Sequence, residues 1–298
     1  MSAFPILGIG EVLWDLLPGG PRLGGAPCNF AFHCQQLGHG SRIISRVGCD
    51  DLGMRLRDEL RALAPPLLEL IQSDATHPTG TVRVEIDENR QPRYTITSDV
   101  AWDFVEFEKQ HEDLARAPSA ICFGSLAQRS PVSRATIRTM LDQSHESLSP
   151  PIRVFDINLR QQFYDREIIE ESLKRSDWLK LNADELPVLA NLFDLPRISP
   201  SKDLAAIRDR YGLALVCLTR GERGCLVQTA GEEIDLPGIP VEVADTIGAG
   251  DAFTAGLVCL TLEGRPLRDA AAFANRFAAR VAGEVGATPR IDRREIES

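Results

Sequence analysis

Residues 245–253, Asp-Thr-Ile-Gly-Ala-Gly-Asp-Ala-Phe, constrain this chain more than any other segment. Gly248 and Gly250 carry no side chains, so the backbone can turn tightly and an anion can approach its N–H groups. A helix that begins at this turn adds unpaired N–H donors and a partial positive charge. Asp251 would then place a proton acceptor beside an anion site, as phosphoryl transfer requires. The alternative is a structural glycine turn in which Asp251 is only a first-turn helix acid.

Composition favours one large α/β domain and limits the possible partners. The 298 residues are 43% hydrophobic and 26% charged, and the formal net charge is −10. Such a charge opposes binding to nucleic acid or to an anionic membrane, so neither is expected as a partner. Seven cysteines include no Cys-x-x-Cys pair, which predicts reduced, buried thiols. Residues 1–4 lack a basic region and no apolar run spans a membrane, so a cytoplasmic location is expected.

Strands and helices are predicted to alternate along most of the chain. Apolar runs predict buried strands, and 213–218 is so uniformly apolar that it predicts a parallel strand covered on both faces. Helical periodicity or end signals predict helices at 30–37, 50–64, 133–143 and 266–282. No linker, internal repeat or low-complexity tract is present, which favours a single domain over residues 1–298.

A different pattern occurs at residues 81–98. Val82, Val84 and Ile86 alternate with polar residues, a polar turn follows at 87–92, and the alternation resumes at 93–98. This pattern predicts a β-hairpin with one covered and one solvated face. An inserted small sheet of this kind can act as a lid or as a dimer contact, and the alternative is a hairpin without a function.

Polar residues occur at predicted turns in the first part of the chain. Asp15 is isolated among apolar neighbours, and Asn29 follows the Gly24-Gly25 pair. Paired glycines let backbone amides approach a ligand, and an asparagine both donates and accepts hydrogen bonds, which suits sugar hydroxyls. The structural alternatives are that Asp15 caps a turn and that Asn29 caps a helix. His33 is predicted to pack within that helix rather than to bind a metal.

A second group of polar residues follows the predicted strands of the later part of the chain. Asn158 and Arg160 follow one apolar run, and Asn182 and Glu185 follow the next. Such residues would gather at the carboxyl ends of parallel strands, where α/β proteins bind ligands. Glu185 either holds a metal-bound water or is a first-turn helix acid. The small residues at 219–224 suit a phosphate or nucleotide loop.

Together these segments resemble the ribokinase-like (PfkB-type) sugar kinases over almost the whole chain. Residues 24–29, Gly-Gly-Ala-Pro-Cys-Asn, resemble the N-terminal substrate signature of that family, and 245–253 resembles its C-terminal catalytic signature. Residues 182–185 fit its Asn-x-x-Glu element. The resemblance implies a three-layer α/β/α fold with a mostly parallel central sheet and a small β-sheet lid, formed by about 12–24 and 78–100.

The resemblance also implies a role for each candidate residue. Asp251 would be the general base that takes the proton from a sugar hydroxyl. The anion hole for the transferring phosphoryl group would be formed by the N–H groups of Gly248, Ala249 and Gly250. The sugar hydroxyls would be bound by Asp15, Gly25, Asn29, Asn158 and Arg160. The nucleotide would be bound by Asn182, Thr219, Gly221, Gly224 and Asn275. Glu185 would hold Mg²⁺ through water, and Asp245 and Ile247 would help bind a monovalent cation such as K⁺.

The implied substrates are ATP and a sugar. Residues 10–15 and 25–27 look most like those of bacterial fructokinases, which implies transfer of the γ-phosphoryl group to a ketohexose, D-fructose to fructose 6-phosphate. The Asp-x-Asn-x-Arg element at 156–160 also resembles 2-keto-3-deoxygluconate kinases. Two further alternatives are a nucleoside kinase and a catalytically silent sugar-binding regulator. Cys28 and Phe30 depart from the smaller residues common in relatives and would narrow the pocket. Lids of this family often pair, so a homodimer is expected.

Overall fold

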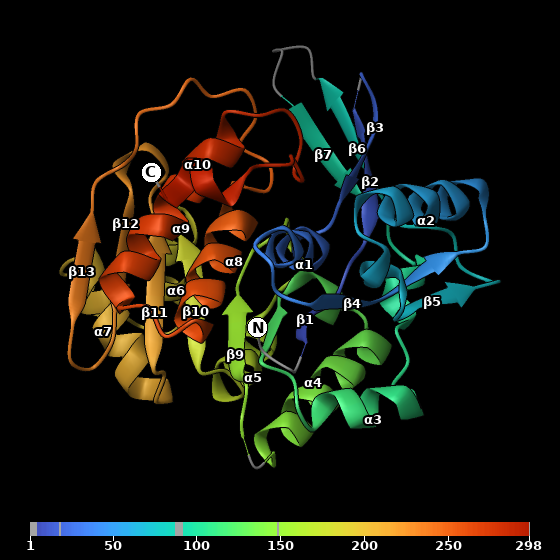
Figure 1. Cartoon of the computed structure of the whole chain (residues 1–298). Helices are drawn as coiled ribbons and strands as arrows, with labels where there is room; N and C mark the ends of the chain where they lie inside the picture. The colour runs from blue at the N-terminus through green and yellow to red at the C-terminus, as the bar shows by residue number, and fades with distance from the viewer. Residues whose placement is uncertain (1–4, 18, 87–91, 148, 298) are drawn as a thin grey trace.

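Two β-sheets form within the residues that the computed structural model describes, which are 5–17, 19–86, 92–147 and 149–297 (Figure 1). Residues 1–4, most of the predicted turn at 87–92 and the side chains of Val84 and Ile86 lie outside the described residues. The large sheet forms an α/β core, and the small sheet stands beside it.

The large sheet has nine strands within the described residues and is mostly parallel, as expected. Its order across the sheet is β13 (Glu233–Leu236), β12 (Cys225–Gln228), β11 (Leu215–Thr219), β10 (Trp178–Asn182), β9 (Ile152–Asp156), β8 (Ala120–Phe123), β1 (Ile6–Ile9), β4 (Ser41–Gly48) and β5 (Ile71–Asp74). All neighbouring pairs from β11 to β5 are parallel, whereas β12 pairs antiparallel with both β11 and β13. β12 and β13, which are short strands at one edge, were not among the predicted strands.

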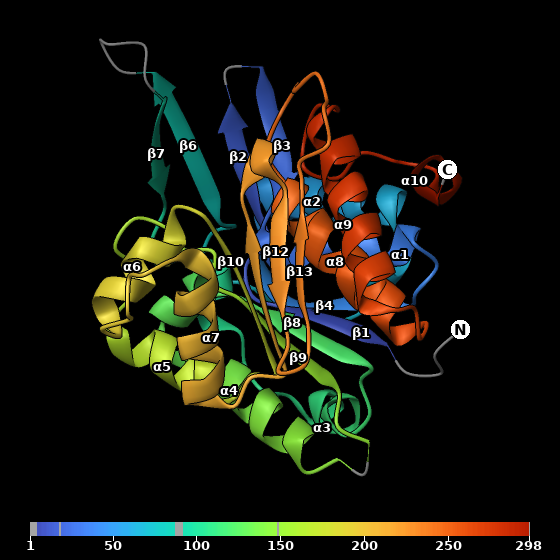
Figure 2. The ribbon, with the colours of Figure 1, turned by 90° about the vertical axis from the view of Figure 1, so that its left-hand side faces the viewer.

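Helices cover both faces of the large sheet, which confirms the three-layer arrangement (Figure 2). One face packs against α3 (Lys109–Ala115), α4 (Pro131–His145), α5 (Arg166–Lys174), α6 (Glu185–Leu192) and α7 (Pro200–Tyr211). The other packs against α1 (Ala26–Gln36), α8 (Ala249–Leu262), α9 (Leu267–Ala282) and α10 (Arg293–Glu297). α2 (Asp51–Leu63) shares a buried cluster with α1. Single 3₁₀ turns lie at Pro65–Leu68, Ala101–Phe104, Leu126–Arg129 and Gly221–Arg223.

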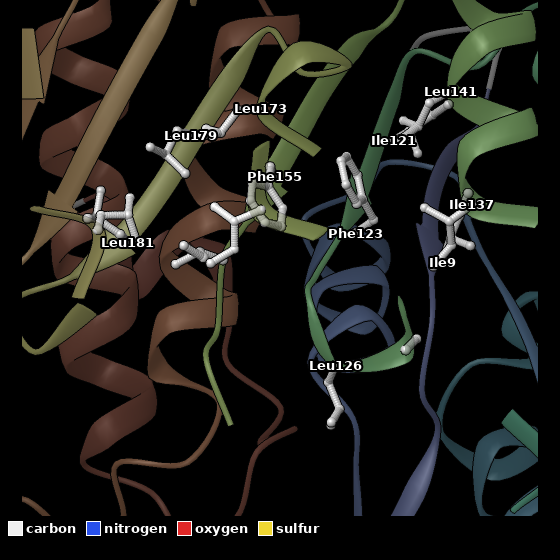
Figure 3. Close-up of a cluster of buried hydrophobic side chains, with 14 of the residues drawn as sticks. Ile9, Ile121, Phe123, Leu126, Ile137, Leu141, Phe155, Leu173, Leu179 and Leu181 are labelled. Atoms are coloured by element: carbon white, nitrogen blue, oxygen red, sulfur yellow. The ribbon is translucent and has the colours of Figure 1, made fainter. Parts of the chain in front are cut away.

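The two core layers explain why the central strands are apolar at consecutive positions. Successive side chains of a strand point to opposite faces of the sheet. Val154 accordingly belongs to the cluster shared with α8 and α9, while Phe155 belongs to the cluster shared with α4 to α7. In that second cluster Phe155 stacks on Phe123, with 5.2 Å between ring centroids (Figure 3). A strand buried on both faces therefore loses the alternating pattern.

The small sheet confirms the predicted hairpin and adds two strands to it. β2 (Leu13–Leu17) pairs antiparallel with β3 (Gly20–Gly24) and parallel with β6 (Thr81–Ile86), which pairs antiparallel with β7 (Pro92–Ile96). Val82 and its cross-strand partner Ile96 are buried in the same cluster as Phe123, so the core of this chain covers them. β1 ends at Ile9 only a few residues before β2, so the small sheet starts at the carboxyl edge of the large one (Figure 1).

Helix α1 begins earlier than the sequence predicted. It starts at Ala26, with Pro27 in the first turn, where the missing N–H of proline costs no hydrogen bond. Gly25 is therefore the residue before the helix, and Asn29 lies inside the first turns. The interpretation of Asn29 as a helix cap is wrong, and its side chain is available for another contact. Within the described residues no helix has the length and apolar content needed to cross a bilayer.

Candidate active site

The predicted site residues meet at the carboxyl edge of the large sheet. β1, β9, β10 and β11 run parallel and end at Ile9, Asp156, Asn182 and Thr219, so the segments that follow these strands lie at one edge. A hollow of about 810 Å³ lies near the opposite ends of β8 and β9, around Arg116 and Ile152, and holds none of the predicted residues.

Gly248 and the start of α8 form a tight glycine turn at the position of the predicted anion site. Gly248 has a φ of +79°, and a Cβ at this position would lie 2.7 Å from the Cα of Ala287. Both observations favour glycine, because other residues are strained at this φ and would clash here. The first N–H groups of α8 have no acceptor within the helix. The start of α8 therefore offers N–H donors and a partial positive charge to an anion.

Asp251 lies in the first turn of α8 and contacts α1. Its Oδ2 accepts a hydrogen bond from Nδ2 of Asn29 at 2.9 Å. Desolvation, reinforced by the negative charge of Asp156, raises the pKa of Asp251 from 3.8 to about 7, while Lys180, Asn29 and Arg160 oppose that increase. A carboxyl group with a pKa near neutrality is well matched to accept a proton from an alcohol.

Glu11 is a second carboxyl group of the site and was not among the predicted site residues. Its residue is 2% exposed, and its Oε2 has no hydrogen-bond partner among the described residues. Burial raises the pKa of Glu11 to about 7, and the charge of Asp251 contributes to that increase. Gly25, with a φ of +110°, packs its Cα against the Glu11 carbonyl, where a Cβ would clash. An acid immediately after an apolar strand was the available signal for Glu11.

Arg160 lies among the carboxyl groups of the site. Its charge lowers the pKa of Glu11, Asp15 and Asp251. The strongest influence on Asp15 is burial, which raises its pKa to about 6. Arg160 is exposed, and its Nη1 donates to the carbonyl of Leu159 at 3.0 Å. Asn158, in the same turn after β9, has a φ of +41°. The structure thus brings Asp15, from the small sheet, into the electrostatic range of the turn after β9.

Asn182 and Glu185 are joined by reciprocal hydrogen bonds. Oε2 of Glu185 accepts the N–H of Asn182 at 2.7 Å, and Oδ1 of Asn182 accepts the N–H of Glu185 at 3.0 Å. Oε1 of Glu185 accepts the N–H of Leu159 at 2.8 Å. Glu185 is also the first residue of α6, so the alternative interpretation of Glu185 as a first-turn helix acid is confirmed as well.

The donor set at the end of β10 fits a hydrated Mg²⁺ rather than a metal held only by protein. No group of three His, Cys, Asp or Glu side chains suited to a metal ion occurs in the described part of the chain. Each carboxylate oxygen of Glu185 accepts one N–H bond and so retains capacity for a water molecule, whereas Oδ1 of Asn182 already accepts the N–H groups of Asp184 and Glu185. Mg²⁺ commonly keeps its waters and binds with substrate phosphates. Glu185 suits that indirect contact, and Asn182 holds the Glu185 backbone in place beside it.

Lys180 is the buried cation of the site and is the second residue that sequence reasoning missed. It lies on β10, and its Nζ is 3.0 Å from Oδ1 of Asp156. Burial opposes its charge, but Asp156, Glu185 and Asp251 together raise the pKa of Lys180 above its ordinary value. A single lysine between the apolar residues Leu179 and Leu181 was the signal that could have found it.

The predicted nucleotide residues gather beyond the end of β11. Thr219 ends that strand, and Gly221 and Gly224 follow with φ values of +57° and +81°. A Cβ on Gly224 would clash with the backbone at 236–237. Asn275, in α9, donates from Nδ2 to the carbonyl of Pro237 at 2.8 Å. Gly224 and Asn275 therefore meet at the end of β13.

Asp245 already has a partner at each carboxylate oxygen. Oδ1 accepts the N–H of Ile247 at 3.0 Å, and Oδ2 accepts the N–H of Gly286 at 3.2 Å. Nη1 of Arg22, from β3, lies 3.6 Å from the same Oδ2. A monovalent cation at Asp245 would therefore share the carboxylate with Arg22.

His33 and the cysteines contribute to packing. Nε2 of His33 lies 3.0 Å from the carbonyl oxygen of Ala287, the residue that also contacts Gly248. Burial lowers the pKa of His33 to about 4, so the ring is neutral near pH 7. Six of the seven cysteines are buried, and Cys49 is exposed.

The comparisons with known proteins agree with this geometry. Residues 20–294 match the pfkB family carbohydrate kinase. A fructokinase of Klebsiella pneumoniae is 30% identical over 84% of this chain and 82% of its own. A fructokinase of Escherichia coli is 28% identical over 97% of both chains. The crystal structure of an uncharacterized sugar kinase from Pyrococcus horikoshii is 27% identical, with a TM-score of 0.81 over 98% of this chain and 96% of that one. The chain therefore belongs to the PfkB family of ATP-dependent carbohydrate kinases and has a ribokinase-like α/β fold.

Proposed function

We propose that this protein transfers the γ-phosphoryl group of ATP to a hydroxymethyl group of a ketohexose, converting D-fructose to fructose 6-phosphate. The observation that carries the proposal is the position of Asp251, which is hydrogen-bonded to Asn29 and lies in the first turn of α8, beside the N–H groups at the start of that helix. A proton acceptor beside an anion site is what phosphoryl transfer to an alcohol needs. The fructokinase relatives support the choice of sugar.

The reaction needs one proton transfer and one phosphoryl transfer. Asp251 accepts the proton of the sugar hydroxyl as the hydroxyl oxygen bonds to the γ-phosphorus, and the bond from that phosphorus to the ADP oxygen breaks. The backbone N–H groups of Gly248, Ala249 and Gly250 receive the negative charge of the transferring group. Positioning and charge stabilisation supply most of the catalysis in such reactions, so a rigid turn beside one base is sufficient.

The sugar would bind between the small sheet and the turn after β9. Asp15, Gly25 and Asn29 are proposed to contact the hydroxyls, with Asn158 and Arg160 on the other side. Oδ1 of Asn29 is buried and has no hydrogen-bond partner among the described residues, so it can accept from a hydroxyl. Asp15, whose pKa is about 6, is mostly ionised at neutral pH and then acts only as an acceptor. These groups suit a ligand rich in hydroxyl donors.

The nucleotide would bind beyond the anion turn. The residues proposed to line its pocket are Asn182, Thr219, Gly221, Gly224 and Asn275. Ile239, Val241 and Val243 are exposed just after the turn that Asn275 contacts, and they offer apolar surface to a base. Mg²⁺ bound with ATP neutralises phosphate charge, and Glu185 would hold it through water. Asp245 and Ile247 are the proposed residues for K⁺.

We further propose one kinase domain over residues 1–298, with a lid formed by about 12–24 and 78–100. The origin of the small sheet at the carboxyl edge supports the lid, as does the 3.6 Å approach of Arg22 to Asp245. A homodimer through this lid and a cytoplasmic location are also proposed, the latter from the buried free thiols. Light scattering that finds a monomer at micromolar concentration would contradict the dimer but not the lid.

An ADP-release assay over a panel of sugars and nucleosides tests the reaction. We expect turnover with D-fructose that depends on ATP and Mg²⁺, and parallel reactions with and without K⁺ measure the contribution of that ion. ADP release only with nucleosides would contradict a sugar kinase. Thermal stabilisation by sugar without any ADP release would favour a silent regulator, which the intact Asp251 and glycines argue against.

A second acceptor, 2-keto-3-deoxygluconate, has one observation in its favour. Arg160 is exposed and lies in the electrostatic range of Asp15 and Glu11 at the proposed sugar site, where a guanidinium can bind a substrate carboxylate. The same panel decides between the two acceptors. A higher kcat/KM for the acidic sugar, lost in Arg160→Gln, would replace D-fructose by this substrate.

A further inference from the structure

One buried carboxylate, Asp156, connects the central sheet to the start of α8. Its Oδ1 lies 3.0 Å from Nζ of Lys180 on β10, and its Oδ2 accepts the hydroxyl of Thr254 in α8 at 3.0 Å. The exposed fractions of these residues are 5% for Asp156, 8% for Lys180 and 2% for Thr254. The three side chains therefore form a buried polar network rather than a solvated ion pair.

This network contacts Gly250 from two sides. The hydroxyl of Thr254 also lies 3.0 Å from the carbonyl oxygen of Gly250, so its single proton is shared between that oxygen and Asp156. A Cβ on Gly250 would lie 2.9 Å from Nζ of Lys180, which places the ammonium directly against this glycine. Gly250 is thus held between a hydroxyl in its own helix and a cation on the sheet.

The network also borders Asp251, the proposed base. Asp156 and Asp251 line the same small pocket of about 10 Å³ between α1, β8, β9 and α8. Replacement of a buried ion pair by apolar residues is often neutral or stabilising, so stability alone does not account for this one. Its charged groups have the geometry to fix the turn that carries Gly250 and Asp251.

We propose that Asp156, Lys180 and Thr254 are positioning residues, which hold the peptide of Gly250 and the carboxylate of Asp251 in the arrangement that phosphoryl transfer needs. This inference rests on the proposed function, in which Asp251 is the base. Thr254 restrains the position of the Gly250 peptide. Asp156 and Lys180 restrain the same turn and also place their charges near the carboxylate of Asp251.

The charge of the network acts on a base that several groups surround. The titratable and polar groups that face Asp251 are Glu11, Cys28, Asn29, Cys122, Asp156, Arg160 and Lys180. Among the charged groups, Asp156 contributes most to the raised pKa of Asp251, and Lys180 opposes it. Removal of the negative charge should therefore lower the pKa of Asp251, and removal of the positive charge should raise it again.

Thr254→Val tests the geometric constraint. Valine has nearly the same shape but no hydroxyl, so we expect kcat to fall roughly ten- to hundredfold while the sugar KM and the acidic limb of the pH profile stay unchanged. Thr254→Ser should restore most of the activity. Thr261→Val is the matched control, because Thr261 lies in the same helix and makes the same type of backbone bond, to Leu257 at 2.8 Å. Equal activity of the Thr254 and Thr261 variants would overturn the inference.

Asp156→Asn tests the charge. The value of kcat/KM follows the ionised fraction of Asp251, and the variant lowers the pKa of Asp251. The acidic limb of the kcat/KM profile should therefore move to lower pH by roughly one unit. The double variant Asp156→Asn/Lys180→Met removes both charges and should move the limb back toward that of the parent enzyme. A merely structural role would lower activity in both variants without these opposite shifts. Circular dichroism and thermal melting confirm that each variant is folded.

The Asp251→Asn variant separates this inference from the proposed function. Full turnover in Asp251→Asn would contradict the assignment of the base, and the positioning role would fail with it. Loss of turnover in Asp251→Asn, together with a normal Thr254→Val and an unshifted Asp156→Asn, would contradict the positioning role alone.

Discussion

Asn29 and Asp251 share a side-chain hydrogen bond of 2.9 Å although 222 residues separate them in the chain. The bond joins the first turns of α1 and α8, which pack against the same face of the large sheet. Its amide donor stabilises the ionised form of a carboxyl group whose pKa is otherwise raised by burial. One contact thus links the proposed sugar loop to the proposed base.

Replacement of Asn29 by Ala should raise the pKa of Asp251. Without the N–H donor, the ionised carboxylate loses a stabilising bond, so the acidic limb of kcat/KM should move to higher pH. Hydrogen bonds to charged groups contribute about 1.5–3 kcal/mol, so kcat/KM at pH 7 should fall about 10- to 100-fold. Steady-state values of kcat/KM, measured at intervals of about half a pH unit from about pH 5.5 to about pH 9, report both effects. Asn191→Ala, at an exposed position in α6, is the control.

Replacement of Asp251 by Asn should remove the base and keep the binding site. We expect turnover to fall by roughly two to four decades, the range for a lost general base. Thermal shifts caused by sugar and by nucleotide should persist, since the shape of the side chain is conserved. An unchanged rate of ADP release would mean that another group accepts the proton, and Glu11 would be the first to test because its pKa is also about 7.

Local patterns in the sequence were sufficient to predict the alternation of strands and helices, the hairpin and the glycine turn before α8, and the family resemblance implied the mostly parallel sheet. Glycine spacing and apolar runs determine each of these local features within a few residues of sequence. β12 and β13 escaped prediction because they form an antiparallel edge whose pairing depends on the rest of the sheet.

The network around Asp156 could not be predicted from the sequence, for a different reason. Its two hydrogen-bonded pairs span 24 and 98 residues, so no local spacing reports them. Lys180 stands in a strand that reads as apolar, and only the tertiary structure places it between Asp156 and Gly250. Burial distinguishes these residues from ordinary surface charges, and burial depends on tertiary packing rather than on neighbouring residues in the sequence.

Replacement of Glu11 by Gln should stabilise the fold at alkaline pH. The pKa of Glu11 is about 7 in the folded protein against 4.5 ordinarily, so between these values the folded state binds more protons than the unfolded state. The free energy of unfolding contributed by this group therefore falls as pH rises through that window and stays low above pH 7. The shift corresponds to at most about 3 kcal/mol.

Urea unfolding of the Glu11→Gln variant at two pH values measures this effect. We expect the variant to exceed the parent protein in stability near pH 8 and the difference to shrink near pH 5, where the carboxyl group is protonated in the folded state. Glu146→Gln is the control, because Glu146 is exposed at the end of α4. A difference that does not change with pH would mean that Glu11 gains a compensating partner when it ionises.

Replacement of Gly248 by Ala should separate steric fit from backbone strain at the anion turn. Gly248 and Gly264 have similar φ values, +79° and +74°, but a Cβ on Gly248 would clash with Ala287, whereas a Cβ on Gly264 meets no atom within 4 Å. Gly264→Ala should therefore cost only about 1–2 kcal/mol of left-handed strain and leave turnover unchanged. Gly248→Ala adds the clash, so it should be less stable than Gly264→Ala in urea unfolding. It should also lose turnover in the fraction that remains folded, because the peptide at 248–249 must rotate to relieve the contact. Normal turnover in folded Gly248→Ala would show that the N–H groups of this turn do not have to keep their present orientation, and the anion hole would then have to be formed elsewhere along α8.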